Sequence, residues 1–287
     1  MILKGMPDLR PMLPAEVDAA TELILSHDWG VRRDWLAYAA DSPACSPVIA
    51  VDADGKVVAT GVGTANGQVG WIGSIFVAPE ARGHGLGRAL TQAIIDALDA
   101  AGCQALCLVA TSDGRRLYER MGFEVQTRYR IMEAPGLAPS MKRDVNPGRS
   151  VRPFETADLG AMLALDRAAT GEDRRHALAA FANPTSTKVL VGAGGELRGF
   201  VCRPPWGGGA TIAPLADDAV AIAEARRYAA GEGGKVRVGI LQDNEKGRDR
   251  LRAAGWMPSW SAPRMIRGEM PAWQPQQIWG QFNHAMG

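Results

Sequence analysis

A glycine-rich segment behind an apolar run is the part of this sequence best suited to chemistry. Shortly after the apolar residues Ile75 to Ala78, it reads Arg82-Gly83-His84-Gly85-Leu86-Gly87-Arg88. The helical spacing of apolar residues that follows places these glycines at the start of a helix. Amides at a helix start carry partial positive charge, and glycines let an anion reach them without obstruction. Together with the two arginines, the segment predicts a cradle for a pyrophosphate group.

The spacing of these glycines excludes two common phosphate-binding motifs. Neither the dinucleotide pattern G-x-G-x-x-G nor the nucleotide pattern G-x-x-x-x-G-K-[ST] is present here. A second pattern lies about 30 residues further on, where Arg116 to Phe123 reads RLYERMGF. Two motifs in this order are much more specific than either of them alone.

Together the two motifs resemble those of the GNAT superfamily of acetyltransferases. The residues RGHGLG fit the family signature R/Q-x-x-G-x-G/A, and LYERMGF looks like its L-Y-x-x-x-G-F motif. The longer stretch FVAPEARGHGLG is similar to the family's strand, proline, loop and helix unit. The resemblance implies an acyltransferase that uses acetyl-coenzyme A as its cosubstrate and needs no metal.

The resemblance also assigns roles to residues. The pantetheine arm is expected along the backbone of Phe76 and Val77, on a strand that splays from its neighbour. Tyr118 matches the tyrosine that protonates the departing thiolate, and a phenol of pKa ~10 suits a thiolate of pKa ~8.5. Simple packing of Tyr118 on a short helix is the alternative. The phosphates are expected on Arg82 and on the amides of Gly83, His84, Gly85, Leu86, Gly87 and Arg88.

The base that takes a proton from the attacking amine has no clear candidate. Relatives often carry a glutamate on the strand before the cradle, where this chain has Gly73-Ser74. Histidine is a common general base in enzymes, but His84 sits inside the cradle, which disfavours a catalytic role. Glu80 is interpreted as a solvated turn residue. An asparagine frequent before the L-Y motif is replaced here by Thr111.

The acceptor pocket is expected above the splayed strands. Trp29, Trp71 and Ser74 are candidates for its lining, because aromatic residues bind organic amines well. Core packing of the two tryptophans is an equally good interpretation. The sequence identifies no acceptor, so a small-molecule amine or an amino acid is the default expectation.

The elements around these residues follow from local patterns. Residues 47–52 and 56–64 predict a hairpin around Asp54-Gly55. A strand, the glycine turn, a helix and a buried strand give a βαβ unit, which implies two parallel strands. The predicted helices cover 15–26, 83–101 and 114–121, and the remaining strands cover 69–77, 103–110 and 123–132.

The sequence repeats itself weakly. Leu9-Arg10-Pro11 recurs as Val151-Arg152-Pro153, 142 residues later, and GRRLYERMGF recurs as GRDRLRAAGW, 133 residues later. We therefore predict two tandem domains of the α+β class, each a mixed, mostly antiparallel sheet flanked by helices. The first covers 1–136 and is expected to bind acetyl-coenzyme A and catalyse. A linker follows at 137–149, and a degenerate copy covers 150–287.

The second copy lacks the features needed for the chemistry. Its Ala213-Pro214 aligns with Ala78-Pro79, but every cradle glycine is lost and Asp217-Asp218 stands at the helix start. Leu251 replaces the tyrosine. This half resembles the C-terminal domain of bacterial tandem GNAT proteins, which implies a role in shaping the acceptor pocket or in assembly.

Bulk properties restrict the partners and the compartment. A net charge of +1 gives no general attraction for nucleic acid or an anionic membrane. None of the four cysteines forms a CxxC pair, so a metal site is not expected and the cytoplasm is the default. The sequence defines no oligomeric state.

The predicted function is an N-acetyltransferase that moves acetyl from acetyl-coenzyme A to a primary amine by direct attack in a ternary complex. A non-catalytic sensor of acyl-coenzyme A is the main alternative. A scaffold with a vestigial site is disfavoured, because glycines at a helix start lower stability without a structural benefit.

Overall fold

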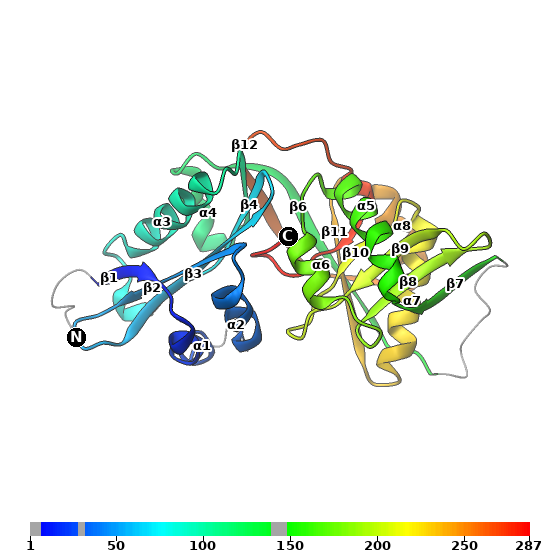
Figure 1. The fold of residues 1–287 in the computed structure, drawn as a ribbon, viewed down its shortest axis with the longest axis horizontal. Helices are drawn as coiled ribbons and strands as arrows, with labels where there is room; N and C mark the ends of the chain where they lie inside the picture. Colours follow the sequence, from blue (N-terminus) through cyan, green and yellow to red (C-terminus); the bar gives the residue numbers. More distant parts are fainter. Residues whose placement is uncertain (1–6, 28–31, 139–147) are drawn as a thin grey trace. The chain divides into compact units, whose positions relative to one another are not determined.

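The computed structural model describes residues 7–27, 32–138 and 148–287, and these form two compact units (Figure 1). The first unit consists of Met1–Glu124, Met265–Glu269 and His284–Gly287. The second unit consists of Val125–Arg264 and Met270–Asn283. Each unit therefore contains residues from both halves of the sequence, whereas the division at 136 and 150 follows the sequence repeat. Residues 139–147 of the predicted linker lie outside the described residues.

The sheet of the first unit has the strand order β1-β2-β3-β4-β5. Its strands are β1 (Asp8–Pro11), β2 (Cys45–Val51), β3 (Val57–Asn66), β4 (Val69–Val77) and β5 (Ala105–Val109). The first four pair antiparallel, and β4 pairs parallel to β5. The hairpin predicted around Asp54-Gly55 is the β2–β3 pair, and the predicted βαβ unit is β4, α3 and β5. Both predictions are confirmed.

Helices cover both sides of this sheet, with α3 and α4 on one side and α1 and α2 on the other (Figure 1). Their bounds are α1 (Val17–Leu25), which follows the 3-10 turn Pro14–Glu16, α2 (Arg33–Asp41), α3 (Leu86–Ala100) and α4 (Ser112–Glu119). A Cβ added at Gly61 would lie 2.6 Å from Ile75 and 2.8 Å from Ile94 of α3. The absence of a side chain there lets α3 pack closely on the sheet.

Helix α3 begins three residues later than the predicted start at Gly83. Gly83 and Gly85 have φ of +85° and +78°, values that no helix residue adopts. Gly85 is the N-terminal cap of α3 instead. Gly102 ends the helix with φ +84°, as its C-terminal position predicts.

Strand β4 separates from β5 just before the glycine segment. The parallel pairing runs from Val69–Ala105 to Ile72–Leu108, whereas β4 itself continues to Val77. The pairing of β4 with β3 also shifts there, so that Gly61 opposes both Ser74 and Ile75 in a β-bulge. Ser74 has φ +52°, and it is the one non-glycine residue with positive φ in the described chain. The end of β4 is thus open on the side where β5 would lie.

Residues His284–Gly287 lie on β3 and β4 of the first unit. The hydroxyl of Thr64 donates to the carbonyl of Ala285 (2.8 Å), and Asn66 Nδ2 donates to that of Met286 (3.0 Å). A Cβ added at Gly73 would lie only 2.4 Å from Cβ of Ala285. Side chains alternate along a strand, so this face is opposite to the one that packs on α3.

The second unit has a five-stranded antiparallel sheet of order β13-β10-β9-β8-β7, together with β11, β6 and β12. Strand β6 (Glu124–Pro135) pairs antiparallel with β11 (Lys235–Leu241) and neighbours β12 (Met257–Gly268). The other strands are β7 (Arg149–Pro153), β8 (Thr187–Gly192), β9 (Leu197–Cys202), β10 (Ala210–Ile212) and β13 (Ile278–Gly280). The helices are α5 (Leu159–Thr170), α6 (Arg175–Phe181), α7 (Ala216–Ala230) and α8 (Glu245–Ala253), with 3-10 turns at Thr156–Asp158 and Pro275–Gln277.

Trp256 and Trp279 are almost completely buried in the core of this unit, beside Ile222 and Leu251. These two tryptophans therefore serve as core residues of the second unit. The end of β12, Met265–Gly268, belongs to the first unit, where it lies next to β5. A Cβ on Gly268 would lie 2.2 Å from the carbonyl oxygen of Gln104, so glycine is required at this contact.

The four cysteines are free thiols, and three of them are buried. Burial raises the pKa of Cys45, Cys103 and Cys202 to about 11. In the described part of the chain, no three His, Cys, Asp or Glu side chains are grouped as a metal would need. Over the same residues, each helix is too short or too polar to span a bilayer.

Candidate functional site

The glycine segment forms an open loop between β4 and α3. A 3-10 turn, Pro79–Ala81, leads into it, and the buried side chains of Ala81 and Leu86 anchor its two ends. A Cβ added at Gly83 or Gly85 would meet nothing within 4 Å. Glycine is therefore required at these two positions by the positive φ, and the space in front of them is open.

The amides at the start of α3 point out of the helix ladder. The first helical hydrogen bond runs from the amide of Ala89 to the carbonyl of Gly85 (3.0 Å). The amides of Leu86, Gly87 and Arg88 precede it, and the first amides of a helix have no partner within it. These donors and the helix dipole favour an anion at this end of α3.

Arg82 is held across the end of β4. Its Nε donates to the carbonyl of Val77 (3.0 Å), and its guanidinium carbon lies 5.9 Å from the centre of the Phe76 ring. Phe76 is buried, whereas the side chains of Arg82, His84 and Arg88 are exposed. The predicted phosphate and pantetheine positions are thus brought together at one end of β4.

Tyr118 lies on α4, the helix that packs beside the start of α3. A Cβ at Gly87 would lie 3.8 Å from Leu117 of this helix. Thr111 caps α4, because its hydroxyl accepts from the amide of Gly114 (3.1 Å). It therefore contributes a helix cap at the position where relatives often have asparagine.

The phenol of Tyr118 is buried, with 8% of the residue exposed, and its ring stands edge-on to Phe123 at 6.2 Å. Burial raises the pKa of Tyr118 to about 12. Burial disfavours the charged phenolate, so the hydroxyl remains protonated at neutral pH. This side chain can therefore donate a proton or a hydrogen bond, but it cannot act as a base there.

The predicted acceptor residues have different surroundings. Ser74, in the bulge of β4, accepts a hydrogen bond from the indole of Trp35 (2.9 Å). Trp71 is 1% exposed and pairs with Thr64, so its ring belongs to the packed face under His284–Gly287. Its burial favours core packing. Trp29 lies outside the described residues.

Gly73 occupies the strand position where relatives often carry the basic glutamate, and the residues around it come from distant parts of the chain. The carbonyl oxygen of His284 lies 2.9 Å from where a Cβ on Gly73 would stand. Burial, and to a lesser degree the charge of Arg32, lowers the pKa of His284 to about 4, so its imidazole is neutral. Glu80 is exposed and pairs with Lys56 (3.4 Å), as expected of a solvated turn residue.

Sequence reasoning missed Trp35 and the segment from His284. Trp35 lies on α2, a helix that was not predicted, and the segment bonds to residues more than 200 positions earlier. No local pattern marks such a distant contact.

The corresponding helix start in the second unit is already occupied by a carboxylate. Asp218, on the first turn of α7, is 1% exposed and accepts hydrogen bonds from Arg149 and from Arg198 Nε (2.9 Å). Asp217 forms an ion pair with Arg250 on α8. Leu251, at the tyrosine position, is fully buried.

We expect Asp218→Ala to lower the free energy of unfolding by about 2–4 kcal/mol, because it leaves two partly buried guanidinium groups without their common carboxylate. Asp217→Ala is the matched control, since its ion pair is exposed and exposed pairs contribute about 0–1 kcal/mol. Urea denaturation of both variants measures the difference. Equal losses would show that Asp218 is not the structural anchor.

Comparisons with known proteins agree with this geometry. The model described as the acetyltransferase (GNAT) family matches residues 12–123, and the one described as the acetyltransferase (GNAT) domain matches residues 162–280. Together they span most of the chain. The chain therefore belongs to the GNAT acetyltransferase family and carries two GNAT domains in tandem. No curated protein matches the sequence.

Solved structures share the fold at low sequence identity. A candidate acetyltransferase from Pyrococcus horikoshii is 18% identical with a TM-score of 0.80, covering 100% of this chain and 98% of that one. A GCN5-related N-acetyltransferase from Sphaerobacter thermophilus is 17% identical, with TM-score 0.65 and coverages of 95% and 100%. A tandem GNAT protein from the clavulanic acid biosynthesis pathway is 15% identical, with TM-score 0.61 and coverages of 92% and 99%. The mixed α+β fold and the tandem arrangement are confirmed.

Proposed function

We propose that the first unit binds acetyl-coenzyme A and transfers the acetyl group to a primary amine of a small molecule or amino acid. The observation that carries this proposal is the separation of β4 from β5 after Ile72, directly ahead of an unobstructed glycine cradle. An open strand edge followed by free helix amides offers hydrogen bonds to an extended arm and then to its phosphates.

In this proposal, some residues bind the cosubstrate and another transfers a proton. The amides of Leu86, Gly87 and Arg88 hold the phosphates, and the backbone at Phe76 and Val77 orients the pantetheine arm. The amine nitrogen attacks the thioester carbonyl carbon, so that a C–N bond forms and the C–S bond breaks. The phenol of Tyr118 gives its proton to the departing thiolate, and solvent restores it. The amine's own proton leaves to water.

The alternative is a sensor that binds acyl-coenzyme A without turnover. One observation favours it, since β4 carries no acidic side chain that could act as a base. The buried phenol of Tyr118 opposes it, because a binding module has no need of a proton donor at that point.

Calorimetric titration of the full chain with acetyl-coenzyme A tests binding, and release of free thiol with a panel of amines and amino acids tests turnover. One site per chain with turnover on a primary amine supports the enzyme. One site without turnover on any amine supports the sensor. No binding would overturn both.

A further inference from the structure

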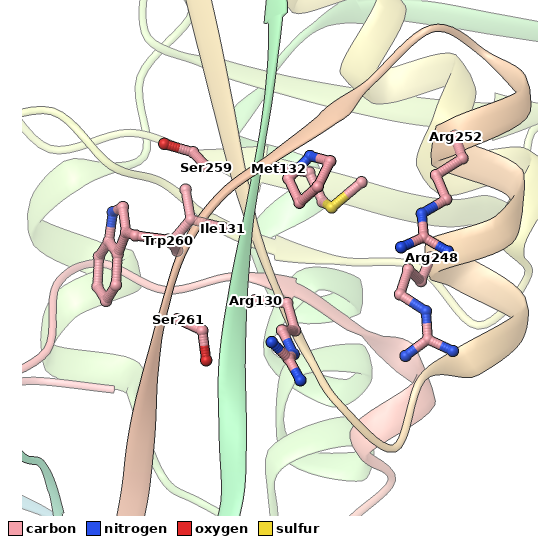
Figure 2. A pocket seen from close by; sticks show the side chains of 9 residues that line it. Arg130, Ile131, Met132, Arg248, Arg252, Ser259, Trp260 and Ser261 are labelled. Atoms are coloured by element: carbon pink, nitrogen blue, oxygen red, sulfur yellow. The ribbon is translucent and has the colours of Figure 1, made fainter.

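The second unit contains a hollow that no part of the proposed acetyl transfer uses. It has a volume of about 390 Å³ and lies between β6, α8 and β12 (Figure 2). Its polar lining residues are Arg130, Arg248, Arg252, Ser259, Trp260 and Ser261. All belong to the second unit. A volume of roughly 300–1,000 Å³ is typical of small-molecule sites.

One side of this hollow is strongly positive. Arg248 and Arg252 stand one turn apart on α8, and Figure 2 shows Arg130 of β6 between this helix and β12. Asp249 is 69% exposed, and its Oδ1 lies 4.0 Å from Arg248 and 3.9 Å from Arg252. Both distances are longer than a hydrogen bond, so the carboxylate of Asp249 neutralises the two guanidinium groups only weakly.

Arg248 is more enclosed than Arg252, with 25% of its side chain exposed against 54%. Its Nε is buried and has no hydrogen-bond partner within the described residues. A buried donor without a partner is unfavourable. An anion in the hollow would compensate the charge of this enclosed guanidinium.

The other side of the hollow is aromatic and hydroxylic. Trp260, on β12, is 44% exposed, which is unusual for so large an apolar ring. Ser261 Oγ accepts from Arg128 Nε (3.0 Å), so its hydrogen remains available for donation. The buried side chains of Ile131 and Met132 give the hollow an apolar lining.

We propose that this hollow binds a small molecule in which a phosphoryl group is joined to a planar ring, of about the size of a nucleoside monophosphate. Three guanidinium groups exceed what a single carboxylate can pair with, whereas a phosphoryl group offers three oxygen acceptors. The ring then lies against Trp260, because guanidinium and indole surfaces both favour flat partners. This site is separate from the cradle, and it gives the second unit a ligand of its own.

The test is calorimetric titration of the full chain with AMP, ribose 5-phosphate and adenosine. Because the cradle can also hold phosphates, the titrations are repeated in Gly85→Glu. We expect AMP to bind with unchanged affinity in that background and at least 10-fold more tightly than either fragment, a difference of about 1.4 kcal/mol. No saturable binding of AMP, or loss of binding in Gly85→Glu, would overturn the proposal.

Variants then locate the site. Arg252→Ala and Arg248→Ala are each expected to weaken AMP at least 10-fold, and Trp260→Ala to weaken AMP but not ribose 5-phosphate. Arg250→Ala is the matched control, since this residue lies on the same helix and pairs with Asp217. Arg252 is 54% exposed, so its variant keeps the fold even where Arg248→Ala lowers stability. Equal weakening by Arg250→Ala, or none by Arg252→Ala, would contradict the assignment.

Discussion

Substitution of Gly85 by glutamate is expected to weaken acetyl-coenzyme A binding at least 100-fold. The position is the N-terminal cap of α3, in front of the amides that would hold the phosphates. A carboxylate there competes for the same amides and repels the pyrophosphate, so electrostatic and steric effects act together. A Cβ at Gly85 meets nothing within 4 Å, so the protein can fold around the new side chain. Calorimetric titration measures the loss directly.

The matched control for this prediction is Gly102→Glu. Gly102 follows the C-terminal cap Ala101 at the other end of the same helix, has φ +84°, and has nothing within 4 Å of an added Cβ. Both variants force a side chain into a left-handed conformation, which is unfavourable by about 1–2 kcal/mol. Only one of them lies in the cradle. Retained affinity in a folded Gly85→Glu, or equal losses in both variants, would remove the cradle assignment.

Gly85→Ala separates the two causes. It adds the backbone strain without a charge, so we expect a loss of about 10-fold or less, set by changed loop geometry. The difference between the alanine and glutamate variants then measures the electrostatic contribution.

The elements of the first unit could be predicted from sequence wherever the signal is local. The turn at Asp54-Gly55 and the mostly apolar stretch from Val69 to Val77 lie within windows of about ten residues, and both elements are present. Helix α2 was missed because it is nine residues long and its buried Trp35 finds its partner in Ser74, 39 residues later. A short helix of this kind is stabilised by tertiary packing more than by its own propensity.

The composition of the two units could not be predicted, because it depends on pairing between distant strands. Residues Tyr129 to Pro135 of strand β6 pair with β11, although the residues of β11 lie more than 90 positions later in the sequence. The residues Met265–Glu269 and His284–Gly287 likewise join the first unit from the far end of the sequence. A sequence repeat reflects the common origin of two segments. The bounds of a compact unit depend instead on where apolar faces are buried.

The same distinction applies to the candidate site. The cradle and Tyr118 are local motifs, and the structure brings them to adjacent helices. The bulge at Ser74 has no sequence signal, because a positive φ there arises from its pairing with β3 and its bond to Trp35. The surroundings of Gly73 depend on Ala285, which no motif connects to it.

Substitution of Tyr118 by phenylalanine is expected to slow acetyl transfer about 100-fold while the dissociation constant of acetyl-coenzyme A changes less than about 2-fold. The ring packs on Phe123 and beside Gly114, and phenylalanine keeps these contacts. What is lost is the proton donor for the thiolate. Without it, the C–S bond must break to an unprotonated sulfur, which raises the barrier of the chemical step alone. Steady-state kinetics with a fixed amine, paired with calorimetry, separates the two effects.

The pH dependence gives this prediction an independent test. Only the protonated phenol can donate, and burial holds the pKa of Tyr118 at about 12, above its ordinary value of ~10. The donor form is therefore fully present below pH ~10 and is lost only as the pH rises through 12. The rate in the unmodified protein should rise with pH as the amine deprotonates, with no descending limb from Tyr118 below about pH 11. A descending limb near pH 8 that disappears in Tyr118→Phe would mean that the phenol is more acidic than its burial implies. An unchanged rate in that variant, alongside an equally unchanged Tyr228→Phe control, would assign the proton to water and leave Tyr118 as a packing residue.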